Sequence, residues 1–356
     1  MMTTSRINRH HEEPYLYNHF VHPLLTAFDM NHQSHTGTIP SAPCRPAGFS
    51  CHLLFIILLL ATALLASCSN EESDDDPRPF IVTTTNLIRD AVENIGGVDV
   101  RTTSIMGPGV DPHVYRATPR DFQQMERSDL VLYNGLFLEG RLSEILDRLG
   151  DQSRAVTGSI PTDRLIEASD YGGTYDPHVW FDAQLWMYVI DDVTEALSTL
   201  LPEKSEKFAG RAESYKKELE ELHLYATQRI QQIPKDRRIL ITAHDAFRYF
   251  GRAYHIEVRG LQGLSTATEF GIQDVSRMVS LIIERGIPAI FIETGVSARA
   301  IDSVIAGVRE RGYTVQMGGS LFSDSMGARG TPEGTYAGMF RHNVETIVQA
   351  LTEELE

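Results

Sequence analysis

The stretch SEKFAGRAESYKKELEELHLYATQRIQQ, residues 205–232, decides how the rest of the chain is organised. It follows Pro202-Glu203 and contains neither glycine nor proline after Gly210. Apolar residues recur along it at helical spacing, namely at Phe208, Tyr215, Leu219, Leu222 and Ile230. A coiled coil is one interpretation of this pattern. We favour a single long helix over 202–232 that packs across two lobes.

On either side of this stretch, strand-like and helix-like segments alternate. Before it, the pattern predicts strands at 80–85, 98–105 and 129–133, with a helix opening at Asn86 and another capped by Thr118 and Pro119. After it, the pattern predicts strands at 238–242, 255–259, 289–292 and 313–316, and helices at 298–310 and 333–354. Repeated strand-then-helix units indicate parallel sheets with helices on both faces.

The predicted fold class is therefore α/β, with two lobes joined by one long rigid helix. Each lobe has a parallel sheet flanked by helices. The predicted segments are a leader (1–67), an acidic tether (68–79), an N-terminal lobe (79–200), the interlobe helix (201–237) and a C-terminal lobe (238–356).

The leader carries an apolar run, LLFIILLLATALLA, at 53–66. Spanning a bilayer takes roughly 20 apolar residues, so this run is too short to do so comfortably. It ends in Leu65-Ala66-Ser67-Cys68, which is typical of a lipoprotein signal peptide with cleavage before Cys68 and a lipid on its sulfur. A buried core helix is the alternative. About fifty residues precede the run, which favours a true start downstream of Met1, such as Met30.

The cysteine content and the net charge limit the classes of function that fit the chain. Of the 3 cysteines, Cys44 and Cys51 belong to the leader and Cys68 to the anchor, so the mature chain has no disulfide. The net charge of −16 argues against nucleic acid as a partner and against electrostatic binding to membranes. We expect an extracytoplasmic protein, anchored to the lipid bilayer through Cys68, whose folded part is a monomer.

Asp-Pro-His occurs twice, ending at His113 and at His178, and two further candidate ligands lie in the second half of the chain. His244 follows a predicted strand, and Asp324 follows the last one. In open α/β sheets, ligands bind beyond the carboxyl ends of the strands, which is where these residues fall. Imidazole nitrogens and a carboxylate oxygen are the donors that a first-row divalent metal prefers.

Three more carboxylates lie near these positions. Asp111 and Asp176 each precede a histidine by two residues, so they either orient the imidazoles or open a turn, and both interpretations stand. Glu293 ends a predicted strand near the same edge. We expect it to support the site or to bond loop backbone, not to bind metal.

Several motifs together resemble the solute-binding lipoproteins of zinc/manganese ABC importers, over essentially all of 79–356. The most specific are GPGVDPHVY (107–115), YNGLFLE (133–139), DPHVWFD (176–182), TAHDAFRYF (242–250) and LFSD (321–324). The resemblance implies two α/β lobes, a single metal between them, ABC permease membrane subunits as partners, and no enzymatic activity. It also implies that His113, His178, His244 and Asp324 are the four ligands.

Two departures from the wider family bear on the metal. Some relatives, typically manganese receptors, have glutamate where this chain has His244, and many zinc receptors have a long histidine-rich loop where 151–175 contains no histidine. The chain therefore resembles the branch with three histidines and one aspartate, which takes zinc or manganese. Ligand softness and the Irving–Williams order favour zinc, while availability and higher coordination favour manganese.

Two other functions compete with a metal receptor. Three histidines suit the catalytic zinc of a hydrolase, but Asp324 fills the position that water would need, and no H-E-x-x-H pattern occurs. A surface adhesin is the third possibility, as a secondary role that members of this family have been given.

Overall fold

The structure of the protein is a computed structural model that describes residues 76–168 and 175–352. The predicted leader, Cys68 and most of the tether lie outside the described residues, as does part of the histidine-free loop. Within the described ranges, every helix is too short or too polar to cross a bilayer.

The N-terminal part contains a sheet of 4 parallel strands in the order β2-β1-β3-β4. Its elements are β1 (Phe80–Thr83), α2 (Asn86–Gly96), β2 (Arg101–Ser104), α3 (Pro119–Arg127), β3 (Leu130–Tyr133), α4 (Ser143–Leu149), β4 (Ser153–Ala155) and α5 (Ala183–Leu200). Side chains alternate across the pleat. Ile81 and Leu132 pack with α2 and α5, whereas Val82 and Val131 pack with α3 and α4. Helices therefore cover both faces, as predicted.

The C-terminal part is also parallel, but its strands form two hydrogen-bonded pairs, β5-β6 and β7-β8. Its elements are β5 (Ile239–His244), α7 (Arg248–Tyr254), β6 (Glu257–Gln262), α8 (Ile272–Arg285), β7 (Ala289–Glu293), α9 (Arg299–Glu310), β8 (Gln316–Leu321) and α10 (Tyr336–Thr352). The pairs lie together because β5 packs beside β7. Ile241 faces α8 and α9, and Phe291 faces α10, so helices again cover both faces.

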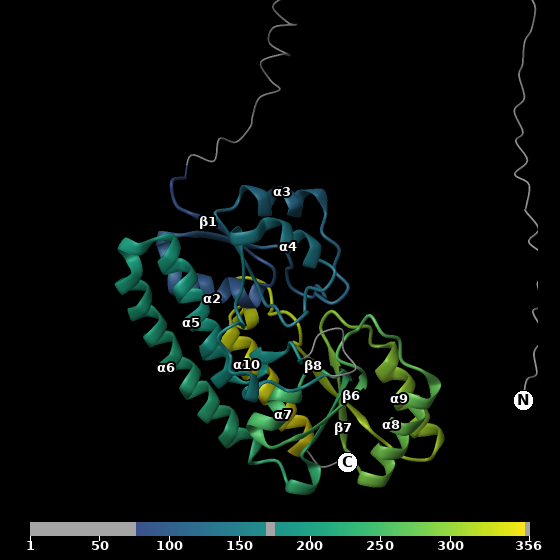
Figure 1. Ribbon diagram of the computed structural model, residues 1–356. Coiled ribbons are helices and arrows are strands. Elements are labelled where there is room, and N and C mark those ends of the chain that lie inside the picture. The colour runs from purple at the N-terminus through teal and green to yellow at the C-terminus, as the bar shows by residue number, and fades with distance from the viewer. Residues whose placement is uncertain (1–75, 169–174, 353–356) are drawn as a thin grey trace, which may run out of the picture. The chain divides into compact units, whose positions relative to one another are not determined.

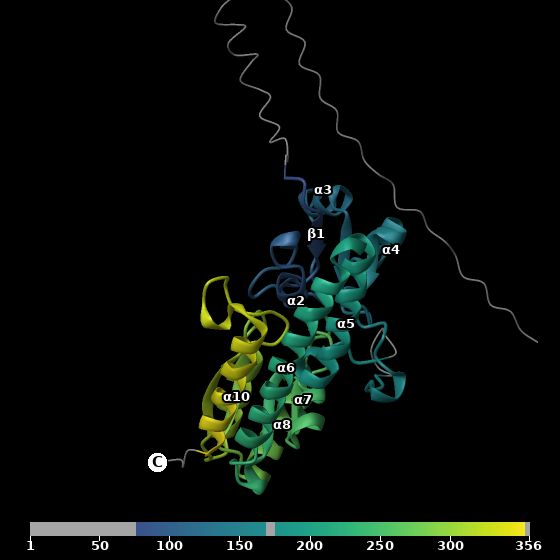
Figure 2. The same cartoon turned by 90° about the vertical axis from the view of Figure 1, so that its left-hand side faces the viewer.

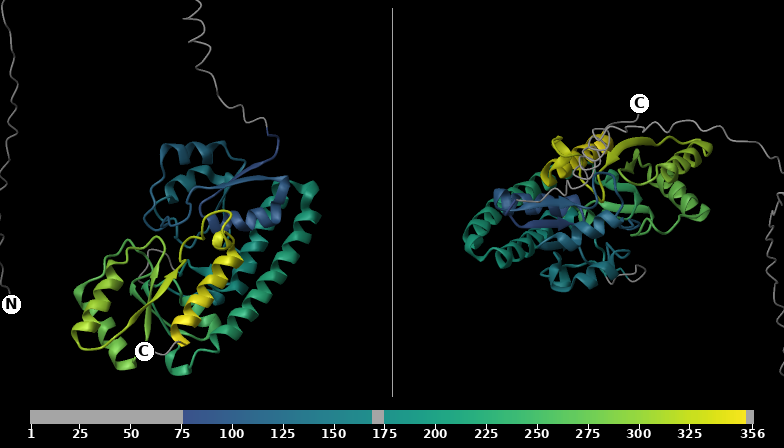
Figure 3. Two further views of the ribbon diagram at one scale, coloured as in Figure 1. Left: turned by 180° about the vertical axis from the view of Figure 1, so that it is seen from behind. Right: turned by 90° about the horizontal axis from the view of Figure 1, so that it is seen from above.

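The predicted long helix is α6 (Ser205–Ile230), which runs past both parts of the fold and packs against α5 (Figures 1 and 2). On its other side it packs against α10 (Figure 3). The predicted apolar stripe is its buried face. The helix begins three residues later than predicted because Pro202–Lys204 forms a 3₁₀ turn. Both the single helix and its position across the two parts are confirmed.

Ion pairs tie α6 at both ends. Near its start, Asp99 lies 2.6 Å from Lys207 and 3.0 Å from Arg211. Near its end, Arg229 lies 2.6 Å from Glu345 of α10. Surface ion pairs of this kind are individually weak, so burial of the apolar stripe supplies most of the attachment and the ion pairs orient it.

Several other predicted boundaries were also wrong. β8 was expected at 313–316 but spans Gln316–Leu321, because Gly318 and Gly319 hid its strand character. At Gly318 a side chain would meet the Phe291 ring at 2.7 Å, so packing requires the glycine that weakens the pattern. β6 starts after His255, whose left-handed backbone caps α7. β2 and α10 are each preceded by a 3₁₀ turn and begin three residues late.

The predicted lobe boundaries stay a prediction. The described residues all belong to one compact unit, Asp75–Glu356. The names N-terminal lobe and C-terminal lobe are used below for 79–200 and 238–356, the two parts that the sheets define.

Candidate metal centre

The structure brings His113, His178, His244 and Asp324 together. Their potential ligand atoms all lie within 4.8 Å of one another, and all four residues are buried. His113 lies in the loop after β2, His178 lies just ahead of a short 3₁₀ turn, His244 ends β5 and Asp324 follows β8. Each lobe therefore contributes two of the four candidate ligands.

The distances within this group match the size of a coordinated ion. Asp324 Oδ2 lies 3.9 Å from His113 Nε2 and 3.5 Å from His244 Nε2, and its Oδ1 lies 3.7 Å from His178 Nε2. The Nε2 atoms of His113 and His178 are 3.2 Å apart. Zinc bonds of about 2.0–2.1 Å imply ligand separations of roughly 3.3 Å around a tetrahedral ion. A small divalent cation therefore fits between these atoms without large rearrangement.

Carboxylates orient two of the three imidazoles. Asp176 Oδ1 lies 2.7 Å from His178 Nδ1, and Glu293 Oε2 lies 2.5 Å from His244 Nδ1. The hydrogen bond to Asp176 holds the ring proton of His178 on Nδ1, so its Nε2 lone pair points toward the centre. Glu293 lies against His244 Nδ1 as an ion-pair contact outside hydrogen-bonding geometry. Glu293 also accepts a hydrogen bond from the His244 backbone N–H at 2.9 Å. Glu293 thus contacts a candidate ligand with both oxygens.

Asp111 is placed differently from Asp176. It accepts a hydrogen bond from the His113 backbone N–H at 2.9 Å, and its other oxygen accepts one from the Thr266 hydroxyl. Thr266 belongs to the C-terminal lobe, so this bond crosses between the lobes. Both aspartates therefore form a turn with the backbone of their histidine, and Asp176 also contacts the imidazole ring directly.

The charges of the group are coupled. Burial opposes ionisation of Asp324, but His244, His113 and His178 together hold its pKa below the usual range. Burial also opposes a charge on His244, yet Glu293 and Asp324 raise its pKa well above the ordinary value. Burial lowers the pKa of His113 to about 3, although Asp324 works in the opposite direction. His113 is therefore a neutral donor, and His244 holds a proton that a metal must displace.

Polar atoms at the centre lack ordinary partners. Within the described part of the chain, neither Asp324 oxygen nor His244 Nε2 has a partner in hydrogen-bonding geometry. Buried polar atoms are rarely left this way, and each such case needs a physical explanation. A bound cation would satisfy all three atoms, and the mixture of nitrogen and carboxylate oxygen suits a first-row divalent ion.

Several side chains that support the site were not predicted to do so. The Trp180 indole, predicted as core, packs at 5.2 Å from the His178 ring and donates to the Ser323 carbonyl at 2.9 Å. The Tyr249 hydroxyl donates to the Asp176 carbonyl at 2.9 Å. Trp180 and Tyr249 lie within the motifs DPHVWFD and TAHDAFRYF, so the sequence offered a reason to connect them with the site. Thr266 lies outside the motifs, so the sequence offered no reason to connect it with the site.

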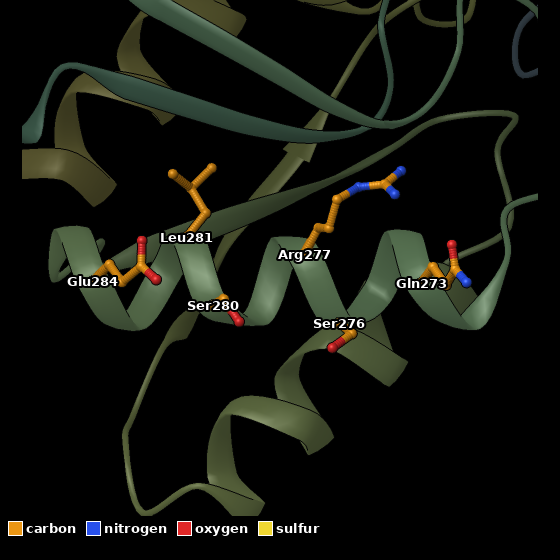
Figure 4. A pocket seen from close by; sticks show the side chains of 6 residues that line it. All are labelled: Gln273, Ser276, Arg277, Ser280, Leu281 and Glu284. Carbon is orange, nitrogen blue, oxygen red and sulfur yellow. The ribbon is translucent and has the colours of Figure 1, made fainter.

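A groove of about 440 Å³ lies elsewhere, on α8, and is lined by Gln273, Ser276, Arg277, Ser280, Leu281 and Glu284. Figure 4 shows Arg277 and Leu281 on one side of the helix and the two serines on the other. The lining has one carboxylate and no imidazole, so it offers no comparable set of metal ligands.

Comparisons with known proteins identify the family of the chain. Residues 81–350 match the family described as zinc-uptake complex component A, periplasmic. The manganese-binding lipoprotein MntA of Bacillus subtilis is 47% identical over 273 residues, which cover 76% of this chain and 89% of MntA. The zinc-binding protein TroA of Treponema pallidum is 45% identical over 276 residues, which cover 77% of this chain and 89% of TroA.

A solved structure supports the fold as well. The structure titled as the periplasmic zinc binding protein TroA from Treponema pallidum superimposes with a TM-score of 0.75 at 45% identity. The match covers 78% of this chain and 100% of that one. The α/β architecture with parallel sheets flanked by helices is therefore shared with a solved relative.

Proposed function

The chain belongs to the zinc-uptake complex component A family, and we propose that it is an extracytoplasmic receptor that binds one zinc or manganese ion. His113, His178, His244 and Asp324 hold the ion in this proposal. The protein then delivers the ion to the membrane subunits of an ABC-type permease. Members of the family act as metal-binding transport receptors and not as enzymes.

One observation carries the proposal: three imidazoles and a carboxylate converge in a buried centre between the lobes. The exposed fractions of the four residues range from 0% to 6%. A hydrolytic zinc needs a position open to water and substrate. A fourth protein ligand and nearly complete burial suit a cargo that is held and later released.

The choice between zinc and manganese depends on geometry and supply. Three imidazoles and a carboxylate bind zinc more tightly than manganese on intrinsic affinity. Manganese prefers more oxygen ligands and higher coordination, which a second Asp324 oxygen would help to supply. The relatives include proteins described as manganese-binding and as zinc-binding. Elemental analysis of protein purified without added metal, followed by competition between Zn²⁺ and Mn²⁺, decides between them.

The ligand set is tested by titrating alanine variants of the four residues with Zn²⁺. Each variant is expected to bind at least about tenfold more weakly, because loss of a ligand leaves a coordination position to water. His342→Ala is the matched control, since this partly buried histidine bonds the Ser320 carbonyl away from the centre. Unchanged stoichiometry and affinity in His244→Ala would show that the ligand assignment is wrong.

Attachment to the membrane is the second part of the proposal. Family members described as lipoproteins support an extracytoplasmic position, and the Leu-Ala-Ser-Cys68 stop supports a lipid on Cys68. Cys68→Ala should move the protein from the membrane fraction to the soluble fraction, whereas Cys51→Ala should leave it membrane-bound. Retention of Cys68→Ala on membranes would refute the anchor. Light scattering of the mature domain tests the proposed monomer.

A further inference from the structure

The loop that carries Asp324 follows β8 of the C-terminal lobe, yet side chains of the N-terminal lobe hold much of its backbone. On one side of Asp324, the Trp180 indole donates to the Ser323 carbonyl at 2.9 Å. On the other side, the Gly109 backbone N–H donates to the Ser325 hydroxyl at 2.9 Å. These contacts tie the loop to segments more than a hundred residues earlier in the chain.

The strongest tie is made by Asn86, the first residue of α2. Its Oδ1 accepts a hydrogen bond from the Met326 backbone N–H at 3.0 Å, and its Nδ2 donates to the Met326 carbonyl at 3.1 Å. One amide side chain therefore satisfies both backbone groups of one residue. Asn86 and Met326 are both fully buried. Water cannot replace either bond without entering the core, so loss of the amide leaves the Met326 backbone unpaired.

Asp324 has little else to fix it from its own lobe. The C-terminal lobe holds the start of the loop through Asn343, which exchanges two hydrogen bonds with the backbone of Phe322. Beyond Phe322, Trp180 and Asn86 of the N-terminal lobe bond the backbone of Ser323 and Met326. His244 shows the opposite arrangement, because Glu293 of its own lobe contacts both its backbone and its ring.

We propose that Asn86 is a positioning residue for metal binding, which holds the Asp324 carboxylate at the centre by clamping the backbone two residues beyond it. The inference rests on the proposed function of the site. Under this proposal three ligands are attached to the N-terminal lobe, His113 and His178 through the chain and Asp324 through Asn86. Thr266 and Tyr249 of the C-terminal lobe also contact the loops of His113 and His178, whereas Glu293 holds His244 from within the C-terminal lobe. Release of the ion then separates His244 from the other three ligands.

A double-mutant cycle tests the role of Asn86. Asn86→Ala in the wild-type background is expected to raise the Kd for Zn²⁺ about tenfold, because one or two buried hydrogen bonds no longer hold the loop. In the Asp324→Ala background, the same change should alter the Kd by less than about twofold, since residues that act through one another are not additive. Equal effects in both backgrounds would overturn the proposal, as would an unchanged Kd in the wild-type background.

Two further measurements separate positioning from general stability. Asn94→Ala is the matched control, because Asn94 lies on the same helix and bonds only Asp90 within it. It should leave Zn²⁺ affinity unchanged. The visible spectrum of the Co²⁺-loaded protein should change in Asn86→Ala as it does in Asp324→Ala. A wild-type spectrum in Asn86→Ala would overturn the proposal.

Asn86→Asp covers the case in which the alanine variant does not fold. Aspartate has the same shape and retains the acceptor, but sets a second oxygen against the Met326 carbonyl. A carboxylate in the first turn of a helix interacts favourably with the helix dipole, so this variant is expected to fold. It should weaken Zn²⁺ binding and alter the Co²⁺ spectrum as the alanine variant does. The Asp324→Ala variant alone tests the ligand assignment, so failure of that assignment is distinguishable from failure of the Asn86 role.

Discussion

The two Asp-Pro-His motifs have the same three residues, and the structure uses them differently. In both, the aspartate accepts a hydrogen bond from the backbone N–H of its histidine, at 2.9 Å in the first and 3.0 Å in the second. Asp176 also contacts the His178 ring, whereas Asp111 accepts the Thr266 hydroxyl of the other lobe. The motif encodes a backbone turn. The surrounding residues decide which further contact the aspartate carboxylate makes.

The surroundings differ because the motifs lie at different depths. Asp176 and His178 are both fully buried, with Tyr249 donating to the Asp176 carbonyl and Arg248 3.8 Å from its carboxylate. Asp111 is only partly buried and lies in a loop that faces the C-terminal lobe. Both motifs therefore contact the C-terminal lobe, Asp111 through Thr266 and Asp176 through Tyr249, and Asp176 also orients the ring of its histidine.

The largest expected difference comes from replacing the two aspartates. Asp176→Ala and Asp111→Ala both remove the turn hydrogen bond, so the difference between them compares the ring contact of Asp176 with the Thr266 bond of Asp111. Loss of a carboxylate that orients a ligating histidine commonly costs roughly 10–100-fold in metal affinity, and we expect Asp176→Ala in that range. Asp111→Ala should cost only a few-fold. Competition of each variant with a chelating dye for Zn²⁺ measures both, and equal losses would contradict the distinction.

The second prediction compares His113 of the first motif with His244. Before metal binds at pH 7, His113 is neutral because burial lowers its pKa to about 3, and His244 is protonated because Glu293 and Asp324 raise its pKa. Binding should therefore release about one proton, and affinity should rise about tenfold per pH unit while His244 titrates. Calorimetry in buffers of different ionisation enthalpy counts the proton. His113→Ala should retain the release and His244→Ala should lose it.

The same shift has a consequence for the metal-free fold. A raised pKa in the folded state stabilises the protein fully below the ordinary histidine value of about 6.5. That contribution is lost as pH rises through the higher folded-state pKa of His244. Metal-free protein should therefore unfold more easily as pH rises above about 6.5, with a smaller change in His244→Ala. A wild-type stability that is flat or rises over this interval would contradict the assignment.

A smaller effect is expected from Thr266, the partner that distinguishes Asp111. Thr266→Val keeps the size of the side chain and removes the bond between the lobes. One hydrogen bond contributes about 1 kcal/mol, so Zn²⁺ should dissociate roughly fivefold faster. Stopped-flow transfer to a chelator measures the rate. Thr268→Val, in the same loop, is the control. Equal dissociation rates for the two variants would show that the bond between the lobes does not affect metal release.

The smallest expected effect is on overall dimensions. Because α6 packs against α5 and α10 and is tied at both ends, metal release should change the radius of gyration by no more than about 1 Å. Solution scattering of metal-free and metal-bound protein measures this change. Asp99→Ala, which removes the carboxylate partner of Lys207 and Arg211, is the variant that should open more widely. A change of several ångströms in the wild type would rule out the rigid helix.

The sequence predicted elements best where local chemistry and burial agree. Helical periodicity identified the buried stripe of α6, and the Thr118-Pro119 cap identified the start of α3. It failed at β8, where two glycines lower strand propensity but allow α10 to pack closely. At β8, close packing between elements outweighs the low strand propensity of glycine, and a local sequence pattern does not contain that packing.

The site shows the same division. By itself, the sequence determined which residues are chemically able to bind a metal, because histidine and aspartate at the ends of predicted strands form a recognisable pattern. Only the tertiary structure decided which groups hold them: Asp176 and Glu293 against imidazole rings, Asp111 across to Thr266, and Asn86 on the Asp324 loop. Asp176 lies 2 residues from its histidine, but the other partners lie 49, 155 and 240 residues apart. Their contacts depend on where the folded backbone places each side chain, and a hydrogen bond formed at that distance leaves no periodicity in the chain.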